Sequence, residues 1–267
     1  MQIKKLLANS QLERLDNRLL LSYVTNFSHA QLIINDDYSL SNEQLTKYNS
    51  LVQRVLNGEP LAYILGIKEF YSREFQVNQH TLIPRPETEL LVDEVISKAK
   101  KNAKILDLGT GSGCIAITCK LERPDLNVTA VDNYIETLLV AKNNAKSLNA
   151  DVKFVQSNWF EEVNQTFDII VSNPPYIEVN DEHLDKLQFE PKHALTDFSD
   201  GLSAIKQIIY ESCKYLNNNG WLMFEHGYNQ AENIRQMFYN CDFINIETIQ
   251  DYANLDRITL GQIITKD

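Results

Sequence analysis

The chain has 267 residues, of which 43% are hydrophobic and 23% charged, enough for one large folded domain or two smaller ones. Its 25 Lys and Arg residues against 36 Asp and Glu residues give a net charge of −11. Because nucleic-acid phosphates attract clustered cations, this charge argues against direct nucleic-acid binding, whereas a basic protein partner fits it.

Cysteine and histidine usage shows no pattern typical of a disulfide framework or a metal site. The four Cys residues have no CxxC spacing, and the five His residues are scattered. We therefore expect reduced thiols and no metal. No apolar run is long enough for a signal peptide or a membrane span, so we expect a cytoplasmic monomer with no membrane partner.

The region from residue 1 to residue 72 is predicted to be a helical domain. Apolar residues recur at steps of three and four over 12–27 and again over 45–55. Capping boxes predict two helix starts, at Ser10 with Glu13 and at Ser41 with Gln44. Gly58 and Pro60 predict the end of the last helix. Because the region has no nucleophile, ligand set or glycine loop, we predict that it recognises the substrate.

Residues 73–102 are predicted to link this domain to the rest of the chain. The stretch "EFYSREFQVN" (69–78) alternates apolar and polar residues around Ser72-Arg73, which predicts a short hairpin. The stretch "LIPRPETELLVDEVI" then enters a helix of about 12 residues. Pro86 suits its first turn.

From residue 103 to residue 267, segments typical of buried strands alternate with helical segments. Strands are predicted at 103–109, 127–132, 152–157, 167–172 and 220–225, and two antiparallel strands at 243–265. Helices are predicted near 114–122, 135–148 and 204–216. The alternation predicts an α/β fold with a doubly wound parallel sheet, to which the closing hairpin adds an antiparallel edge.

A glycine loop, "DLGTGSG", follows the first of these strands and opens the first helix. Asp132 ends the second strand, where it could bond a ribose diol. The G-x-G-x-G spacing differs from the dinucleotide pattern, and the cationic sulfonium and ammonium of S-adenosyl-L-methionine favour a nearby carboxylate. This cofactor is therefore preferred over a dinucleotide and over a turn that serves packing alone. The candidate cofactor residues of the loop are Asp107, Gly109, Thr110, Gly111, Ser112 and Gly113.

The fourth strand ends in "NPPY", which predicts a clamp for a planar NH₂ group. The Asn173 side-chain oxygen and the Pro174 carbonyl could accept the two N–H bonds of an amide or aromatic amine. Pro175 would hold the Pro174 carbonyl rigid, and Tyr176 could pack on the planar group. A turn leaving the sheet would explain the prolines alone. We therefore predict Asn173, Pro174 and Tyr176 as catalytic residues, with Pro175 as a further substrate contact.

Six stretches in order, "LIPRPETELL", "DLGTGSG", "SNPPYI", "FEPKHAL", "DGL" and "FEHG", make the chain resemble the HemK-type glutamine methyltransferases that act on peptide chain release factors. The resemblance runs from about residue 58 to the C-terminus. It implies a seven-stranded, Rossmann-like class I methyltransferase sheet at 103–267. It also implies a substrate, the glutamine of the Gly-Gly-Gln motif of class-1 release factors, methylated on its side-chain nitrogen.

By this resemblance, 109–113 form the cofactor loop, Asp132 binds the ribose and Trp159 lies beside the adenine. Residues 173–176 then hold the glutamine, with Asn173 also at the cofactor. The sequence departs from the family at three positions: Asn158 replaces an Asp, and Ser72 and Asn254 each replace a Gly.

Other functions remain open on the sequence alone, and an RNA or another protein amide as the methyl acceptor is the hardest of them to exclude. The Asn-Pro-Pro-Tyr motif also occurs in adenine-amine DNA methyltransferases, although the chain shows no segment rich in Lys and Arg for a nucleic-acid target. A non-catalytic module that binds the cofactor would have no evident need for an amide clamp. A dehydrogenase would bind a nicotinamide cofactor at the same loop.

Overall fold

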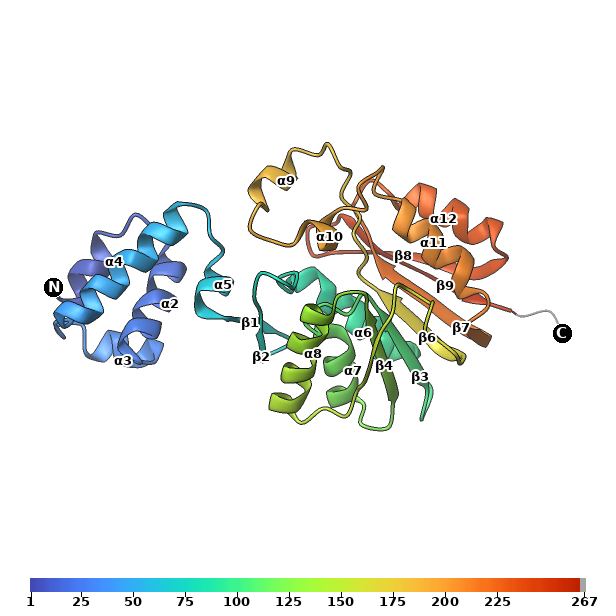
Figure 1. Cartoon of the computed structure of the whole chain (residues 1–267), viewed down its shortest axis with the longest axis horizontal. Coiled ribbons are helices and arrows are strands. Elements are labelled where there is room, and N and C mark those ends of the chain that lie inside the picture. Colours follow the sequence, from blue (N-terminus) through green and yellow to red (C-terminus); the bar gives the residue numbers. More distant parts are fainter. Residues whose placement is uncertain (265–267) are drawn as a thin grey trace. The chain divides into compact units, whose positions relative to one another are not determined.

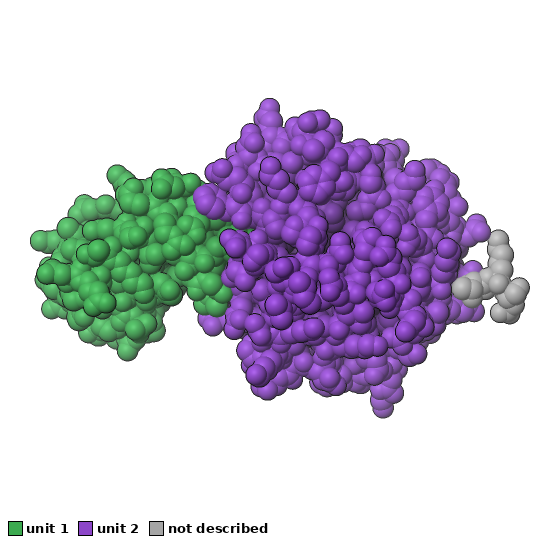
Figure 2. All heavy atoms as spheres, in the orientation of Figure 1, with its two compact units in different colours: residues 1–67 green, residues 68–267 purple. Residues whose placement is uncertain are grey.

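The chain forms two compact units in a computed structural model that describes residues 1–264 (Figure 1). Unit 1 covers Met1–Ile67, and unit 2 begins at Lys68 (Figure 2). Each unit has buried apolar clusters of its own. The units are therefore described one at a time.

Unit 1, all of which is described, consists of five helices: α1 (Ile3–Ala8), α2 (Arg14–Thr25), α3 (His29–Ile34), α4 (Asn42–Leu56) and α5 (Leu61–Leu65). Apolar side chains from all five meet in one core, where Leu20, Tyr48 and Ile64 are buried. The Tyr48 hydroxyl donates to Asn17 Oδ1 at 2.7 Å, and Asn17 Nδ2 donates to the Leu6 carbonyl at 3.1 Å. These bonds join α1, α2 and α4 in the predicted helical region.

Helix starts in unit 1 follow the predicted capping boxes only in part. Ser41 and Gln44 form the predicted box, each side chain accepting from the other residue's backbone N–H. The box predicted at Ser10 is wrong, because α2 begins only at Arg14 and has no side-chain cap. A third box, at Ser28, begins α3 and was not predicted. The last predicted stop is followed by one more short helix, α5.

The predicted hairpin is present, with strands β1 (Ile67–Phe70) and β2 (Arg73–Gln76). Its turn residues are Tyr71 and Ser72, with φ of 51° and 58°, one position earlier than predicted. Phe70 and Phe75 are buried in a core of unit 2. The hairpin is therefore part of unit 2, and the boundary between the units falls at Ile67 rather than at residue 72.

The helix predicted after Pro86 is present, with a tighter first turn. A 3-10 turn, η1 (Pro86–Thr88), leads into α6 (Glu89–Lys98), which has 10 residues rather than about 12. Glu89 Oε1 accepts from the Tyr71 backbone N–H at 2.7 Å. This bond joins the hairpin to α6.

The described part of unit 2 contains a sheet of seven strands in the order β5-β4-β3-β6-β7-β9-β8. Their bounds are β3 (Lys104–Leu108), β4 (Asn127–Asp132), β5 (Lys153–Gln156), β6 (Phe167–Ser172), β7 (Leu216–Glu225), β8 (Phe243–Gln250) and β9 (Asp256–Ile263). The pairings are parallel except those of β9, which is antiparallel to β7 and to β8. The predicted doubly wound α/β sheet is confirmed, with β9 lying inside the edge strand β8. Residue 265, predicted in the last strand, lies outside the described residues.

Helices cover both faces of this sheet (Figure 1). They are α6, α7 (Cys114–Glu122), α8 (Ile135–Leu148), α11 (Ser203–Ser212) and α12 (Ala231–Asn240), whereas the short helices α9 (His183–Lys186) and α10 (Lys192–Leu195) lie in the connection between β6 and α11. Side chains alternate along each strand, so Ile105 packs in a core with α6, α7 and α8, and Leu106 in a core with α11 and α12.

Two predictions about the C-terminal helices need correction. The helix predicted to reach residue 216 ends at Ser212, and Leu216 begins β7. Helix α12 was not predicted at all, although Ala231, Ile234 and Phe238 are buried on one face at steps of three and four.

The carboxyl ends of β3, β4 and β6 meet at one edge of the sheet. β3 pairs with β4 on one side and with β6 on the other, and the chain runs outward through β4 and β5 before it returns to β6. Strand order therefore reverses between β3 and β6, where open α/β sheets bind ligands. The glycine loop, Asp132 and Asn173 all follow or end these strands.

In the part of the chain that the structure describes, no helix is long and apolar enough to cross a membrane.

Candidate active site

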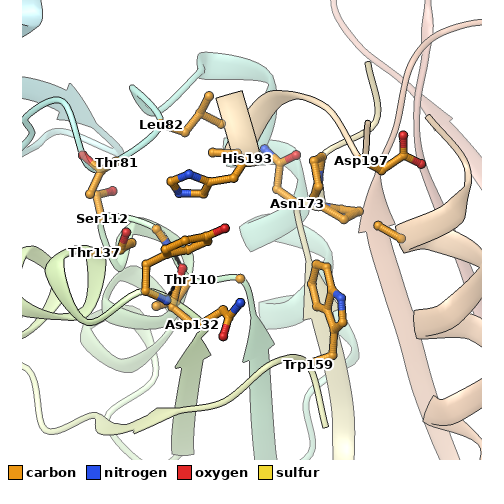
Figure 3. A pocket seen from close by; sticks show the side chains of 18 of the residues that line it. Thr81, Leu82, Thr110, Ser112, Asp132, Thr137, Trp159, Asn173, His193 and Asp197 are labelled. Carbon is orange, nitrogen blue, oxygen red and sulfur yellow. Dashed lines mark hydrogen bonds between the residues drawn. The ribbon is translucent and has the colours of Figure 1, made fainter. Parts of the chain in front are cut away.

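A cavity of about 350 Å³ opens at this edge of the sheet (Figure 3). Every lining residue belongs to unit 2. The walls come from six segments of the chain: 80–88, 109–115 with the glycine loop, 132–137, 157–159, the clamp segment 173–175, and residues between 193 and 207. The fold thus brings the predicted cofactor loop and the predicted clamp to one cavity.

The glycine loop turns sharply from β3 into α7. Gly111 has a φ of 58°, and a Cβ placed there would meet no atom within 4 Å. Gly113 has a φ of 84°, and its Cβ would lie 2.7 Å from Ile117 Cδ1. Gly111 therefore leaves open space beside the cavity, whereas Gly113 allows α7 to pack closely. Gly113 does not line the cavity, unlike Gly109, Thr110, Gly111 and Ser112.

Asp132 faces the cavity from the end of β4. Its Oδ2 accepts from the Gly111 backbone N–H at 3.0 Å, and its Oδ1 accepts from the Tyr134 N–H at 3.1 Å. Burial raises the pKa of this carboxyl, and the backbone donors lower it in part. Each carboxylate oxygen keeps a further lone pair, so the group can also accept from a pair of ligand hydroxyls.

Asp107 lies beneath the loop and does not line the cavity. Its carboxyl is completely buried, and Thr110 Oγ1 donates to its Oδ2 at 2.6 Å. Burial raises the pKa of Asp107 to about 7. Within residues 1–264, Asp107 Oδ1 and Ser112 Oγ have no hydrogen-bond partner. Ser112 lines the cavity, although its hydroxyl oxygen is buried. Asp107 does not line the cavity, and its contact with a cofactor stays a prediction.

Trp159 stands beside the glycine loop, as Figure 3 shows. Its ring would lie 3.5 Å from a Cβ on Gly109, and its own φ is 50°. Ser157 Oγ holds this turn by donating to the Trp159 carbonyl at 2.9 Å. Asn158 also lines the cavity, and its amide donates to Glu161 Oε1 at 2.9 Å. The tryptophan thus offers a ring face to a flat ligand group next to the loop.

Asn173 extends from the end of β6 into the upper part of the cavity in Figure 3. Pro174 and Pro175 line the wall beside it. Tyr176 does not line the cavity: its ring packs in the core with α11 and α12, and its hydroxyl donates to Glu225 Oε1 at 3.0 Å. The expected packing of Tyr176 on a substrate group is therefore replaced by a supporting position behind the wall.

Several lining residues were not assigned a role from the sequence. Tyr134 stacks on His193 with ring centroids 3.7 Å apart. Arg85 forms an ion pair with the buried Glu190, which also accepts from the Ile83 backbone N–H. Arg85 lies in "RPET" and Glu190 in "FEPKHAL", so the family resemblance marked the motifs but gave these side chains no function. Within residues 1–264, no three His, Cys, Asp or Glu side chains are placed to hold a metal ion.

Comparisons with known proteins agree with this geometry. The Methyltransferase small domain family matches residues 86–250, and the PrmC N-terminal domain family matches residues 1–66. Release factor glutamine methyltransferase from Neisseria gonorrhoeae is 45% identical, over 95% of this chain and 94% of the relative. The chain belongs to the release factor glutamine methyltransferase family. A relative with the same name from Buchnera aphidicola is 43% identical over 97% of this chain and 95% of its own.

Solved structures with low identity to this family member share its fold. A methyltransferase from Pyrococcus furiosus matches with a TM-score of 0.59 at 17% identity, covering 81% of this chain and 100% of that one. The T. thermophilus 16S rRNA N2 G1207 methyltransferase, solved with AdoMet and guanosine, matches with a TM-score of 0.52 at 16% identity, covering 73% and 49%. The predicted class I methyltransferase fold is confirmed.

Proposed function

We propose that the chain transfers a methyl group from S-adenosyl-L-methionine to a glutamine side-chain nitrogen in class-1 peptide chain release factors, at their Gly-Gly-Gln motif. The observation that carries the proposal is that Asn173, Pro174 and Pro175 line the same cavity as the glycine loop and Asp132. The name shared by the curated relatives supports the choice of substrate.

The residues of the cavity fit the cofactor. Asp132 can accept from the ribose hydroxyls, Trp159 can cover one face of the adenine, and the open space beside Gly111 lets a ligand approach the backbone. When bound, S-adenosyl-L-methionine supplies an electrophilic methyl group on a sulfonium sulfur, which leaves with the bonding electrons.

The clamp segment orients the acceptor nitrogen. An amide nitrogen is a weak nucleophile because its lone pair is delocalised into the carbonyl. The Asn173 side-chain oxygen and the Pro174 carbonyl can accept its two N–H bonds, which aims the lone pair away from both acceptors and towards the methyl group. Pro175 limits the movement of the Pro174 carbonyl, because the residue before a proline is restricted.

We further propose that unit 1 recognises the protein substrate. Unit 1 has a complete core of its own, and it contributes no residue to the cavity. One glutamine side chain offers too little surface for selective binding, so a second contact with the release factor is needed. Unit 1 carries six Lys and Arg against six Asp and Glu residues, so the net charge of −11 belongs to unit 2, and recognition by unit 1 cannot rest on an excess of negative charge.

Transfer of a labelled methyl group tests the proposal. The protein is incubated with labelled S-adenosyl-L-methionine and one of three substrates. These are a class-1 release factor, the same factor carrying Ala in place of the Gly-Gly-Gln glutamine, and duplex DNA. We expect label in the first factor only. Label in duplex DNA instead would support the adenine-amine methyltransferase. Binding of the cofactor with no label in any of the three would support a non-catalytic module.

A further inference from the structure

Two buried side chains lie behind Asn173 and connect it to β7. Asn173 Nδ2 donates to Thr88 Oγ1 at 3.2 Å, and Thr88 Oγ1 donates to Glu225 Oε2 at 2.6 Å. Thr88 is 2% exposed and Glu225 is 1% exposed. Thr88 ends the 3-10 turn of the "RPET" segment, and Glu225 is the last residue of β7. Folding thus joins three polar side chains that are far apart in the sequence, Asn173, Thr88 and Glu225, by consecutive hydrogen bonds.

The direction of each hydrogen bond follows from the chemistry of the groups. Glu225 accepts at both carboxyl oxygens, from Tyr176 and from Thr88, so the Thr88 hydroxyl gives its single proton to Glu225. The Thr88 oxygen is then left as an acceptor, and it takes a proton from the nitrogen of the Asn173 amide. The Asn173 oxygen must consequently point the other way. If the amide were reversed, the Asn173 oxygen would face the Thr88 oxygen, and neither atom would have a proton to donate to the other.

The ends of this chain of bonds are themselves held. The Tyr176 hydroxyl donates to the second oxygen of Glu225 at 3.0 Å. Burial raises the pKa of Glu225, whereas the bonds from Thr88 and Tyr176 and the positive charge of Arg257 on the neighbouring strand β9 lower it in part. Two donors therefore fix both oxygens of Glu225, and the carboxylate cannot rotate freely beneath Thr88.

We infer that Thr88 and Glu225 are positioning residues that fix the Asn173 amide with its oxygen towards the cavity. This inference rests on the proposed function, in which the Asn173 oxygen accepts an N–H bond of the substrate amide. If Asn173 were reversed, its side-chain NH₂ would face the NH₂ of the substrate amide, and two donors cannot form a hydrogen bond with each other. The Thr88–Glu225 pair therefore sets the polarity of the clamp without touching the substrate nitrogen.

Substitutions at Thr88 separate positioning from packing. Thr88→Val keeps the shape and removes the hydroxyl, whereas Thr88→Ser keeps the hydroxyl. We expect Thr88→Val to lower kcat on the release factor by ~10- to 100-fold, with KM and the cofactor Kd changed by less than about threefold. Thr88→Ser should recover most of kcat. The matched control is Thr259→Val, which removes another fully buried hydroxyl, bonded to His226 and outside the cavity wall.

A second readout needs no release factor. The side-chain NH₂ resonances of Asn173, assigned by their loss in Asn173→Ala, report its bond to Thr88 in the free protein. We expect one proton to exchange slowly in the wild type and in Thr259→Val, and both to exchange fast in Thr88→Val.

Failure of the inference and failure of the proposed function give different results. If wild type methylates the release factor and Thr88→Val, folded, does so at the same kcat, the inference is overturned while the function stands. If wild type does not methylate it, the function fails, and the NMR comparison alone decides the polarity of Asn173. Fast exchange of both wild-type protons would overturn the inference even where Thr88→Val does not fold.

Discussion

The Asn173 amide is the single side chain on which the proposed chemistry depends most. Asn173→Ala removes one of the two acceptors for the substrate N–H bonds. By analogy with single oxyanion-hole donors, the loss of about 2–4 kcal/mol should lower the rate of methyl transfer by about 30- to 1,000-fold. Single-turnover kinetics with saturating cofactor measures it, and a melting curve checks the fold. A folded variant that retains the wild-type rate would remove Asn173 from the clamp.

The buried Asp107 carboxyl should make stability depend on pH. Burial raises its pKa from 3.8 to about 7, so the folded state holds the proton more tightly than the unfolded chain. The resulting stability is present below about pH 4 and is lost as the pH rises through about 7. Asp107→Asn stays neutral and keeps an acceptor for Thr110. In urea unfolding without cofactor, wild type should lose up to about 4 kcal/mol relative to this variant between pH 4 and pH 8. Parallel pH curves for the two proteins would contradict the assignment.

At the scale of elements, the turn from β3 into α7 uses two glycines for different reasons. Both have positive φ, but only Gly113 would place a Cβ against α7, 2.7 Å from Ile117 Cδ1. Gly111→Ala should cost about 1–2 kcal/mol of unfolding free energy from its backbone alone. Gly113→Ala should cost about 1–2 kcal/mol more, because the Ile117 side chain must change its rotamer and Ala141 of α8 lies 3.2 Å away. Urea unfolding measures the loss of unfolding free energy in each variant. Equal losses in the two variants would show that the contacts around Gly113 add no cost.

The strands and the glycine loop were predictable because their signals are local. In the run Lys104–Leu108, three of the five residues are apolar and every residue after Lys104 is buried, as expected of a strand covered on both faces. Asn173 was predictable because it follows such a run directly. Local signals also explain the errors: at Ser10 the capping pattern is present, yet the hydroxyl accepts from Leu12 in a turn before the helix. Helix α12 was missed although half of its ten residues are apolar.

The polar groups behind the clamp could not be predicted in this way. Thr88 and Glu225 are 137 residues apart, and only the pairing of β6 with β7 and the packing of α6 against them bring them together. Two departures from the family could be interpreted only from the structure, because both lie where the backbone is left-handed. Ser72 and Asn254, which replace glycines of the family, have φ of 58° and 60°.

At the scale of the whole molecule, the division into two units predicts separable binding and recognition. A chain that begins at Ile67 keeps the whole hairpin, whose Phe70 and Phe75 belong to the core of unit 2. If it folds, this chain should bind S-adenosyl-L-methionine with wild-type affinity. We expect its kcat/KM on intact release factor to fall by about tenfold or more, because contacts supplied by unit 1 are lost. A short Gly-Gly-Gln peptide is the control, and its methylation should change little. Equal kcat/KM on intact factor would exclude recognition by unit 1.

The central claim is methyl transfer to one nitrogen of one glutamine, and tandem mass spectrometry of the product tests it most directly. A class-1 release factor prepared without prior methylation is incubated with the protein and S-adenosyl-L-methionine and then digested. We predict one added methyl group on the Gly-Gly-Gln peptide, located on the glutamine side-chain nitrogen, and almost none with Asn173→Ala. An unmodified peptide from a protein that binds the cofactor, or a methyl group on another residue, would contradict the claim.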